Sequence, residues 1–196
     1  TIELFEWFSV GVLKLSFNFL FDSVTTVMLV VVTGISFLVH LYSTSYMEND
    51  PHLVRFMSYL SLFTFFMLFL VTSGNLVQMF FGWEGVGLSS YLLVNFWFTR
   101  IEANKSALKA IIVNRFGDVG IILALGATFF VFRSFDYSVI FSVSEDLDKV
   151  YFAVINWSVH GLTLICFFLF VGCVGKSAQL GLHTWLPDAM EGPTPV

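Results

Sequence analysis

The sequence predicts an all-α protein, a polytopic bundle of about five transmembrane helices with a broken helix near its C-terminal end. Of the 196 residues, 57% are hydrophobic and 12% are charged, whereas soluble domains carry about 25% charged residues. The mean hydropathy is +0.85. Five stretches also approach the length of about 20 apolar residues that a bilayer core requires. We therefore expect one transmembrane domain over residues 1–196.

The five expected spans follow one another with mostly short connections. They cover residues 23–46, 56–72, 76–98, 105–132 and 155–174. Asp22 or Ser23 can cap the first helix, because a side-chain oxygen at that position accepts from a free backbone N–H. Residues 1–19 form a shorter apolar segment whose structure the sequence leaves open.

The chain after the fifth span contains residues that interrupt a helix. This stretch is "KSAQLGLHTWLPDAMEGPTPV", with Gly181, Pro187, Gly192, Pro193 and Pro195. We expect a helix break and its following segment over residues 175–196. Broken helices in transporters line cavities or ion sites, and a plain surface loop is the alternative.

Charged loops predict how the spans are oriented. The loops after the first and third spans, with the start of the fourth, fall on one side and carry Arg55, Arg100, Lys105 and Lys109. The acidic residues of the long loop fall on the other side: Glu145, Asp146 and Asp148. Because basic loops stay inside, the Lys and Arg side is expected to face the cytoplasm or, in an organelle, the matrix.

Several classes of function are excluded by composition. The net charge of −5 is spread thinly, without the basic stripe that nucleic acid binding requires. Cys166 and Cys173 lie about two turns apart on one helix face, too far for a disulfide, and we expect them to be small packing residues. No Cys or His cluster has the spacing of metal ligands.

Ionisable residues inside apolar spans are the candidate functional residues. A central Asp, Lys or Arg costs about 2.5 to 3.5 kcal/mol to insert, so each one is a functional hypothesis. Glu84 lies deep in the third span. An unpaired carboxyl there favours the protonated form, and a nearby cation favours the carboxylate. Glu84 is therefore a candidate proton site, with a neutral Glu hydrogen-bonded between helices as the alternative.

The other candidates lie on the fourth span and at the end of the fifth. Arg115 and Asp118 are three residues apart and share a helix face, so a local ion pair that aids insertion is the alternative to a functional pair. Gly117 and Gly120 leave room for another helix to approach.

Two further candidates lie near the helix break. Lys176 can pair with a carboxylate on another helix or extend to the membrane interface. His183 can pass protons, because imidazole titrates near neutral pH.

Several of these stretches, in order, resemble one family. They are "LVQMFFGWEGVGLSSYLL", "NRFGDVG" and "VGKSAQLGLHTWLPDAMEGPTPV", preceded by "SFLVHLYSTSYMENDPHLVRF". The set resembles the antiporter-like membrane subunits of respiratory complex I over nearly the whole chain. Members of that family continue past "GPTPV" with a second, inverted half, so this chain resembles the N-terminal half.

The resemblance implies a proton-translocating subunit of NADH:ubiquinone oxidoreductase. Glu84 and Lys176 would form an interacting pair in the proton relay, with functional weight also on Asp118 and Arg115. Redox chemistry would lie elsewhere in the complex, with NADH, flavin, iron-sulfur clusters and quinone on other subunits and no cofactor on this chain. The alternatives are a subunit of a multi-subunit cation/proton antiporter or membrane hydrogenase, or a structural scaffold that does not pump.

The resemblance also implies partners and a location. The partners would be other membrane-arm subunits of complex I, the lipid bilayer and a C-terminal half, encoded separately or in a longer chain. The location would be the mitochondrial inner membrane, with the bacterial plasma membrane as the alternative.

Overall fold

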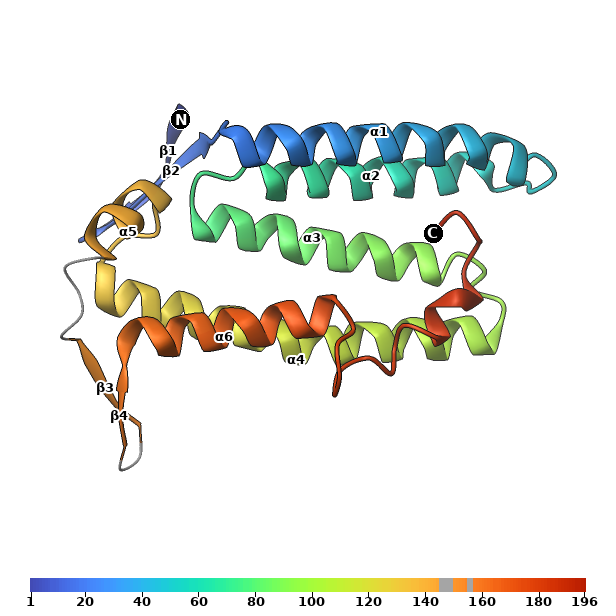
Figure 1. Ribbon diagram of the computed structural model, residues 1–196. Helices are drawn as coiled ribbons and strands as arrows, with labels where there is room; N and C mark the ends of the chain where they lie inside the picture. The colour runs from blue at the N-terminus through green and yellow to red at the C-terminus, as the bar shows by residue number, and fades with distance from the viewer. Residues whose placement is uncertain (145–149, 155–156) are drawn as a thin grey trace.

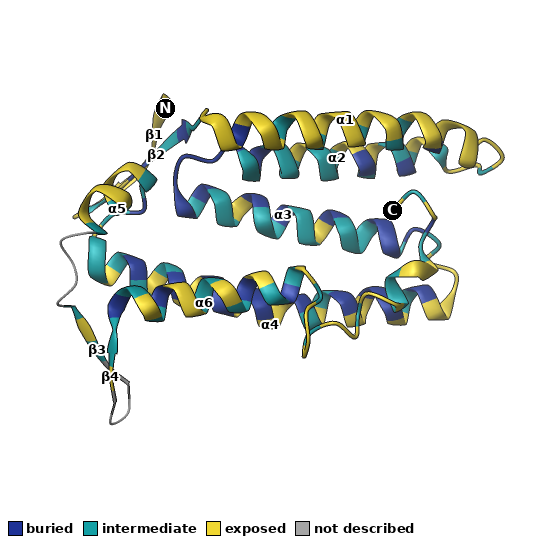
Figure 2. Cartoon of the chain, in the orientation of Figure 1, coloured by how far each residue is buried: buried dark blue, intermediate teal, exposed yellow. Residues whose placement is uncertain are grey.

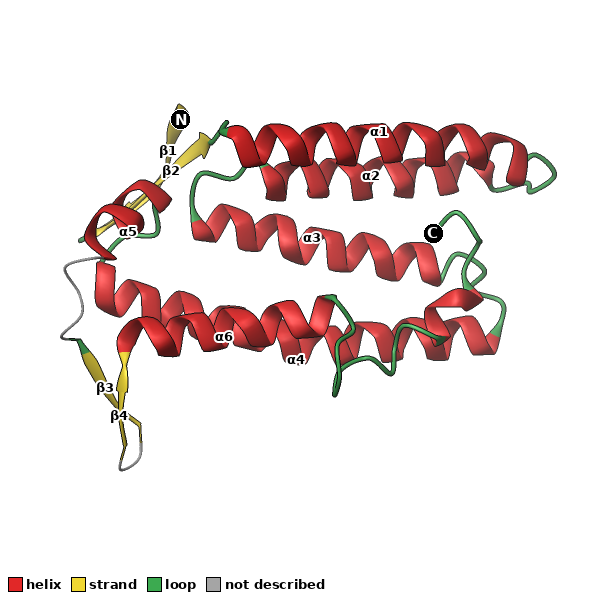
Figure 3. Cartoon of the chain, in the orientation of Figure 1, coloured by secondary structure: helices red, strands yellow, loops and turns green. Residues whose placement is uncertain are grey.

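The structure is a computed structural model that describes residues 1–144, 150–154 and 157–196. The acidic residues Glu145, Asp146 and Asp148 therefore lie outside the described residues. Figure 1 shows the long helices side by side, with the strands and the shortest α-helix gathered at one end of the bundle. Figure 3 shows the strands as a minor part of a helical chain. The predicted helix bundle is confirmed.

The elements of the described chain are six α-helices, two hairpins and a 3-10 helix. The helices are α1 (Ser23–Tyr46), α2 (Leu53–Val71), α3 (Leu76–Val94), α4 (Ile101–Phe132), α5 (Tyr137–Val143) and α6 (Gly161–Lys176). The strands are β1 (Ile2–Val10), β2 (Leu13–Phe19), β3 (Tyr151–Val154) and β4 (Trp157–His160), and the 3-10 helix is η2 (Asp188–Glu191).

The long helices follow the predicted spans closely. α1 begins where Asp22 caps it, since Asp22 Oδ1 accepts from the Thr25 N–H at 2.7 Å and Thr25 Oγ1 accepts from the Asp22 N–H at 2.7 Å. This reciprocal pair is a capping box. Within the described residues, three helices are long and apolar enough to cross a membrane: α1, α2 and α4. α3 carries several polar residues, and the 16 residues of α6 extend only about 24 Å.

Two hairpins and one short helix were not predicted. Residues 2–19 form the antiparallel pair β1 and β2, which settles the segment that the sequence left open. The fifth span begins at Gly161 rather than at residue 155, because residues 157–160 pair with residues 151–154 as strands; residues 155–156 lie outside the described residues. α5 lies within a stretch that the sequence analysis treated as a loop.

The helices are held together by close backbone contacts at glycines. α3 packs between α2 and α4, and α6 packs along α4 (Figure 1). A Cβ atom added at Gly117 of α4 would lie 3.1 Å from the Gly175 Cα of α6, and one at Gly120 would lie 2.9 Å from the Phe168 carbonyl oxygen. The prediction that Gly117 and Gly120 leave room for another helix is confirmed.

The outer faces of the bundle are apolar and exposed. Figure 2 shows α1 exposed over most of its length. Only 6% of the most apolar stretch of this helix is buried within the chain. Cys166 and Cys173 are also exposed, so they do not pack against the helices of the described chain. α6 turns its Gly172 and Gly175 side toward α4 instead. Such continuous apolar exposure suits a helix that faces lipid or another membrane helix.

The predicted basic end of the bundle is present. Arg55 at the start of α2 donates from Nη2 to the carbonyl oxygen of Phe96, after α3, at 3.2 Å. The two basic loops are thus in contact, and the start of α4, with Lys105 and Lys109, lies at the same end (Figure 1). Which compartment this end faces stays a prediction.

The helix break expected near the C-terminal end is also present. α6 ends at Lys176, and positive φ values at Ala178 and Gly181 redirect the chain. The chain then runs along α4, where Lys109 Nζ and Asp188 Oδ2 form an ion pair at 2.6 Å. The segment therefore packs against the bundle.

The contact between α4 and α6 leads to a stability prediction. Changing Gly120 to Ala places a methyl group against the Phe168 carbonyl and should lower the free energy of unfolding by about 1 to 3 kcal/mol. Gly126 has no atom within 4 Å of an added Cβ, so Gly126→Ala should be neutral or stabilising by up to about 1 kcal/mol. Thermal unfolding of the protein in detergent measures both. Equal Tm values for the two variants would contradict the close contact.

Candidate functional site

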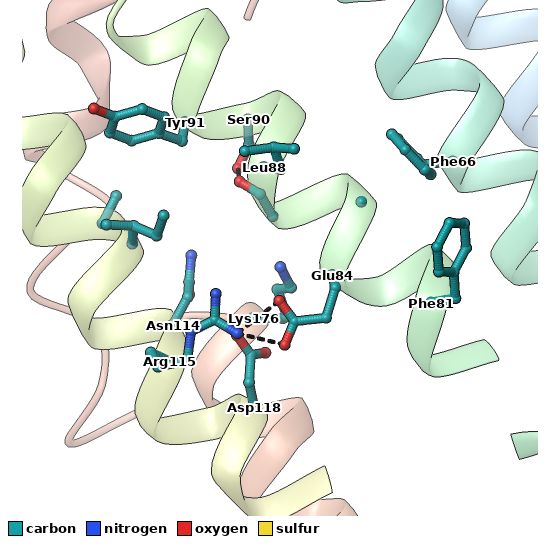
Figure 4. Close-up of a pocket in the computed structure, with 14 residues that line it drawn as sticks. Phe66, Phe81, Glu84, Leu88, Ser90, Tyr91, Asn114, Arg115, Asp118 and Lys176 are labelled. Atoms are coloured by element: carbon teal, nitrogen blue, oxygen red, sulfur yellow. Dashed lines mark hydrogen bonds and ion pairs between the residues drawn. The ribbon is translucent and has the colours of Figure 1, made fainter. Parts of the chain in front are cut away.

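The predicted intramembrane charges surround one cavity. The cavity has a volume of about 390 Å³ and lies between α3, α4 and the end of α6. Its lining includes Glu84, Arg115, Asp118 and Lys176 (Figure 4). Four of the five candidate residues from the sequence therefore meet at one site.

α3 is fixed so that Glu84 points away from α2. The Asn75 side chain caps this helix by accepting from the Gln78 N–H at 2.7 Å. Gly82 lies against α2, where an added Cβ would be 2.8 Å from the Leu70 Cα. Because Gly82 faces α2, Glu84, which lies two residues further along the helix, is directed at α4 (Figure 4).

Glu84 forms a direct ion pair with Arg115. Arg115 Nη1 lies 2.5 Å from Glu84 Oε1 and 2.7 Å from Glu84 Oε2. The Glu84 side chain is 29% exposed and that of Arg115 is 52% exposed. A charge-assisted bond of this kind is stronger than a neutral one. It links α3 to α4 across the cavity.

Asp118 is the most buried charge of the site. Its residue is 4% exposed. One oxygen, Oδ1, accepts from the Trp83 indole N–H at 2.7 Å, and Oδ2 lies 3.7 Å from Arg115 Nη1. The local Arg115–Asp118 pair expected from the sequence is therefore present at a longer distance than the Glu84–Arg115 pair. Arg115 lies between two carboxylates.

Lys176 reaches the same cavity from the end of α6. Its Nζ lies 5.6 Å from the centre of the Trp83 ring, a distance typical of a cation–π contact. In the described chain, Arg115 is the residue in ion-pair contact with Glu84, and Lys176 is not within 4.0 Å of either carboxylate. The direct Glu84–Lys176 contact that the resemblance implies is therefore not formed in this structure.

His183 lies away from the cavity. It is exposed in the turn after α6 and does not contribute to the cavity lining. The four intramembrane charges meet because they lie on helices that pack together, whereas His183 belongs to the segment beyond the break. This structure does not bring His183 to the other candidates.

Two residues of the site were missed by the sequence analysis. Asn114 lines the cavity, and its buried Oδ1 has no hydrogen-bond partner among the described residues. Trp83 contacts both Asp118 and Lys176. Both belong to the quoted motifs, "NRFGDVG" and "GWEG", but a neutral side chain in an apolar helix gives no signal of its own. The roles of Trp83 and Asn114 become visible only when the structure shows which charged side chains lie beside them.

The charged side chains of the site compensate one another. Two carboxylates and two cations carry a net formal charge of zero when all four are ionised, so the cluster is compensated as a unit. The described residues contain no group of three or more His, Cys, Asp or Glu side chains that could hold a metal. An arrangement with two acceptors and two cations allows one charge to change partner while the others remain compensated.

The fold and the site together define an antiporter-like membrane helix bundle with a compensated charge cluster in its interior. A family model described as NADH:quinone oxidoreductase/Mrp antiporter, TM, matches residues 73–196. A second, described as NADH-Ubiquinone oxidoreductase (complex I), chain 5 N-terminus, matches residues 7–57. The chain therefore belongs to the NADH:quinone oxidoreductase/Mrp antiporter family.

Similar curated proteins agree with this assignment. The chain is 65% identical to NADH-ubiquinone oxidoreductase chain 5 of Acanthamoeba castellanii and 63% identical to that of Chondrus crispus. In both cases all of this chain is covered, and it spans 29% of the length of the relative. The Marchantia polymorpha protein of the same name is 55% identical, again over 29% of its length.

A solved structure shows the same fold. The structure of the Mrp complex from Dietzia sp. matches with a TM-score of 0.81 and 24% sequence identity, over 100% of this chain and 20% of that one. At this identity the likeness concerns the fold. It shows that the arrangement of helices described above is an antiporter-like one.

The Glu84–Arg115 pair leads to a prediction about coupled stability. Glu84→Gln or Arg115→Gln alone leaves one charge of the cluster without its direct partner, so each should destabilise more than the double variant. We expect a coupling energy of about 1 to 2 kcal/mol, below that of fully buried pairs because Arg115 is half exposed. Thermal unfolding in detergent of the unmodified protein, the two single variants and the double variant measures this coupling energy.

A surface pair supplies the matched control for this cycle. Glu102 and Lys105 form a 3.1 Å pair with side chains 70% and 67% exposed, and the same cycle there should give about 0.5 kcal/mol or less. A coupling energy for Glu84 and Arg115 that is no larger than this would show that the two residues do not act as a unit.

Proposed function

We propose that this chain is the proton-translocating N-terminal part of a membrane subunit of an NADH:ubiquinone oxidoreductase complex, and that Glu84 takes up and releases a proton on the path. The compensated cluster of two carboxylates and two cations at one cavity carries this proposal, because intramembrane charges are costly and mark ion or proton pathways. The family assignment and the chain 5 relatives support the choice of complex.

The geometry suggests how the proton would load. In this structure Arg115 is the direct cationic partner of Glu84. Arg115 Nη1 also lies 3.7 Å from Asp118 Oδ2, so a small rotation toward Asp118 would leave Glu84 without its cation. A carboxyl group in apolar surroundings then favours the protonated form. The return of Arg115, or the approach of Lys176, would expel the proton.

The cavity can hold the water that such a transfer needs. Its volume exceeds that of several water molecules, at about 30 Å³ each. The unpaired Asn114 Oδ1 supplies a buried acceptor, and Asn114, Ser90 and Tyr91 all contribute to the lining of the cavity. Buried polar groups without protein partners are usually satisfied by ordered water. Water held in this cavity would connect the Glu84 and Asp118 carboxyl groups that line it.

The energies are compatible with pumping. Moving one charge through the membrane potential costs about 2.3 kcal/mol per 100 mV. A change of one pKa unit corresponds to about 1.4 kcal/mol. If an exchange of cationic partners changes the pKa of a carboxyl group by a few units, the energy involved is large enough to load and release a proton against a typical membrane potential.

The rest of the proposal concerns the redox reaction, the partners and the location. In our proposal the redox reaction between NADH and ubiquinone takes place on other subunits, with their flavin and iron-sulfur clusters, and this chain carries no cofactor. Its partners are the other membrane-arm subunits of complex I and the lipid bilayer. Because the named relatives come from eukaryotes, we propose the mitochondrial inner membrane as its location.

The test is proton pumping by the assembled complex with Glu84→Gln, reconstituted in vesicles. We expect assembly on a native gel and a fall of NADH-driven proton uptake of about tenfold or more, because a positioned proton-transfer group contributes at least that much. Glu102→Gln is the matched control, since Glu102 is an exposed carboxylate in the first turn of α4, and this variant should pump as the unmodified complex does.

Two outcomes would contradict the proposal. Unchanged pumping with Glu84→Gln would make Glu84 a structural residue and favour a scaffold that does not pump. Proton uptake that requires Na⁺ and proceeds without NADH oxidation would favour the Mrp-type cation/proton antiporter instead.

A further inference from the structure

Trp83 makes two polar contacts that the proposed proton path does not use. Its indole N–H donates to Asp118 Oδ1 at 2.7 Å. The centre of its ring lies 5.6 Å from Lys176 Nζ. One side chain on α3 thus contacts a buried acid on α4 and a cation on α6, the two helices that pack most extensively on each other.

Gly87 completes the place where the Lys176 ammonium lies. Gly87 follows Trp83 by four residues, one helical turn further along the same face of α3. A Cβ atom added there would lie 2.7 Å from Lys176 Nζ. The ammonium group therefore occupies space that any other residue would fill. The Trp83 ring and the Gly87 gap form what we call the ammonium seat.

We propose that Trp83 is a positioning residue that couples Asp118 to Lys176: its N–H holds the Asp118 carboxylate while its ring, with Gly87, keeps the Lys176 ammonium away from Glu84. This inference rests on the proposed function, since it concerns the same proton path. The indole N–H is a donor only, so its bond is strongest when Asp118 is ionised.

The coupling follows from the shape of the indole group. The ring is rigid and planar, so the N–H cannot leave Asp118 without turning the face on which Lys176 lies. A proton on Asp118 weakens the N–H bond and frees the ring to turn. Lys176 then leaves the ammonium seat and approaches Glu84. Protonation of one acid is thereby converted into movement of the cation that acts on the other.

Trp83→Phe in the assembled complex tests the first half of the proposal. Phenylalanine keeps an aromatic face for Lys176 but has no N–H for Asp118. We expect the complex to assemble and its coupled NADH turnover to fall about tenfold, the effect of losing one hydrogen bond to a charged group. Trp97→Phe is the matched control, because Trp97 donates to Asp50 at 3.2 Å and stacks on Arg100 outside the cavity.

A combination with Asp118→Asn separates positioning from packing. If Trp83 acts through the Asp118 carboxylate, adding Trp83→Phe to Asp118→Asn lowers turnover no further. A packing role would add its full effect in both backgrounds. Additive losses, or a Trp83→Phe complex that pumps as Trp97→Phe does, would overturn the inference. Neither result would affect the proposed function, which depends on Glu84→Gln.

Gly87→Ala tests the ammonium seat without changing Trp83. The added methyl group displaces only the flexible end of Lys176, so the fold should be kept, and we expect coupled turnover to fall while uncoupled NADH oxidation is retained. Gly126→Ala, with open space around the added atom, is the control. Equal turnover in the two alanine variants would contradict the proposed role of the ammonium seat. This test holds even if the Trp83→Phe complex failed to assemble.

Discussion

The site depends on the close contact between α4 and α6. A Cβ atom added at Gly117 or Gly175 would lie 3.1 or 3.0 Å from the Cα of the other glycine, so the helices would have to move apart to accept it. In a membrane such close packing replaces the hydrophobic effect as the force between helices. Asp118 lies one residue after Gly117, and Lys176 lies one residue after Gly175. The glycines that join the two helices therefore also fix where the acid and the cation lie.

A second constraint is that charges in an apolar bundle must compensate one another. Arg115 satisfies Glu84 directly and lies close to Asp118, which also accepts from Trp83. Removing one member leaves the others in surroundings that do not stabilise them. The same arrangement allows an exchange of partners, since Arg115 Nη1 lies 2.5 Å from Glu84 Oε1 and 3.7 Å from Asp118 Oδ2. Structure and proposed function thus have one physical origin.

The sequence identified site residues where a side chain is energetically costly in an apolar helix. Glu84, Arg115, Asp118 and Lys176 could be selected because charges inside apolar helices are rare, and the role of Gly117 and Gly120 followed from their size. Trp83 and Asn114 could not be selected, because their contacts depend on how three helices pack. The hairpin of residues 2–19 was missed for a related reason: a short apolar run fits a strand or a helix. His183 was grouped with the charges by chemistry alone, and its exposure beyond the helix break separates it from them.

The pair Glu84 and Arg115 has two interpretations, an aid to insertion or a proton site, and one measurement separates them most directly. The double variant Glu84→Gln and Arg115→Gln removes both charges together and leaves the bundle compensated, so proton uptake per NADH oxidised can be measured in a stable complex. Our account predicts normal assembly with strongly reduced proton uptake. Normal assembly with unchanged proton uptake would contradict it and would leave the pair a purely structural role.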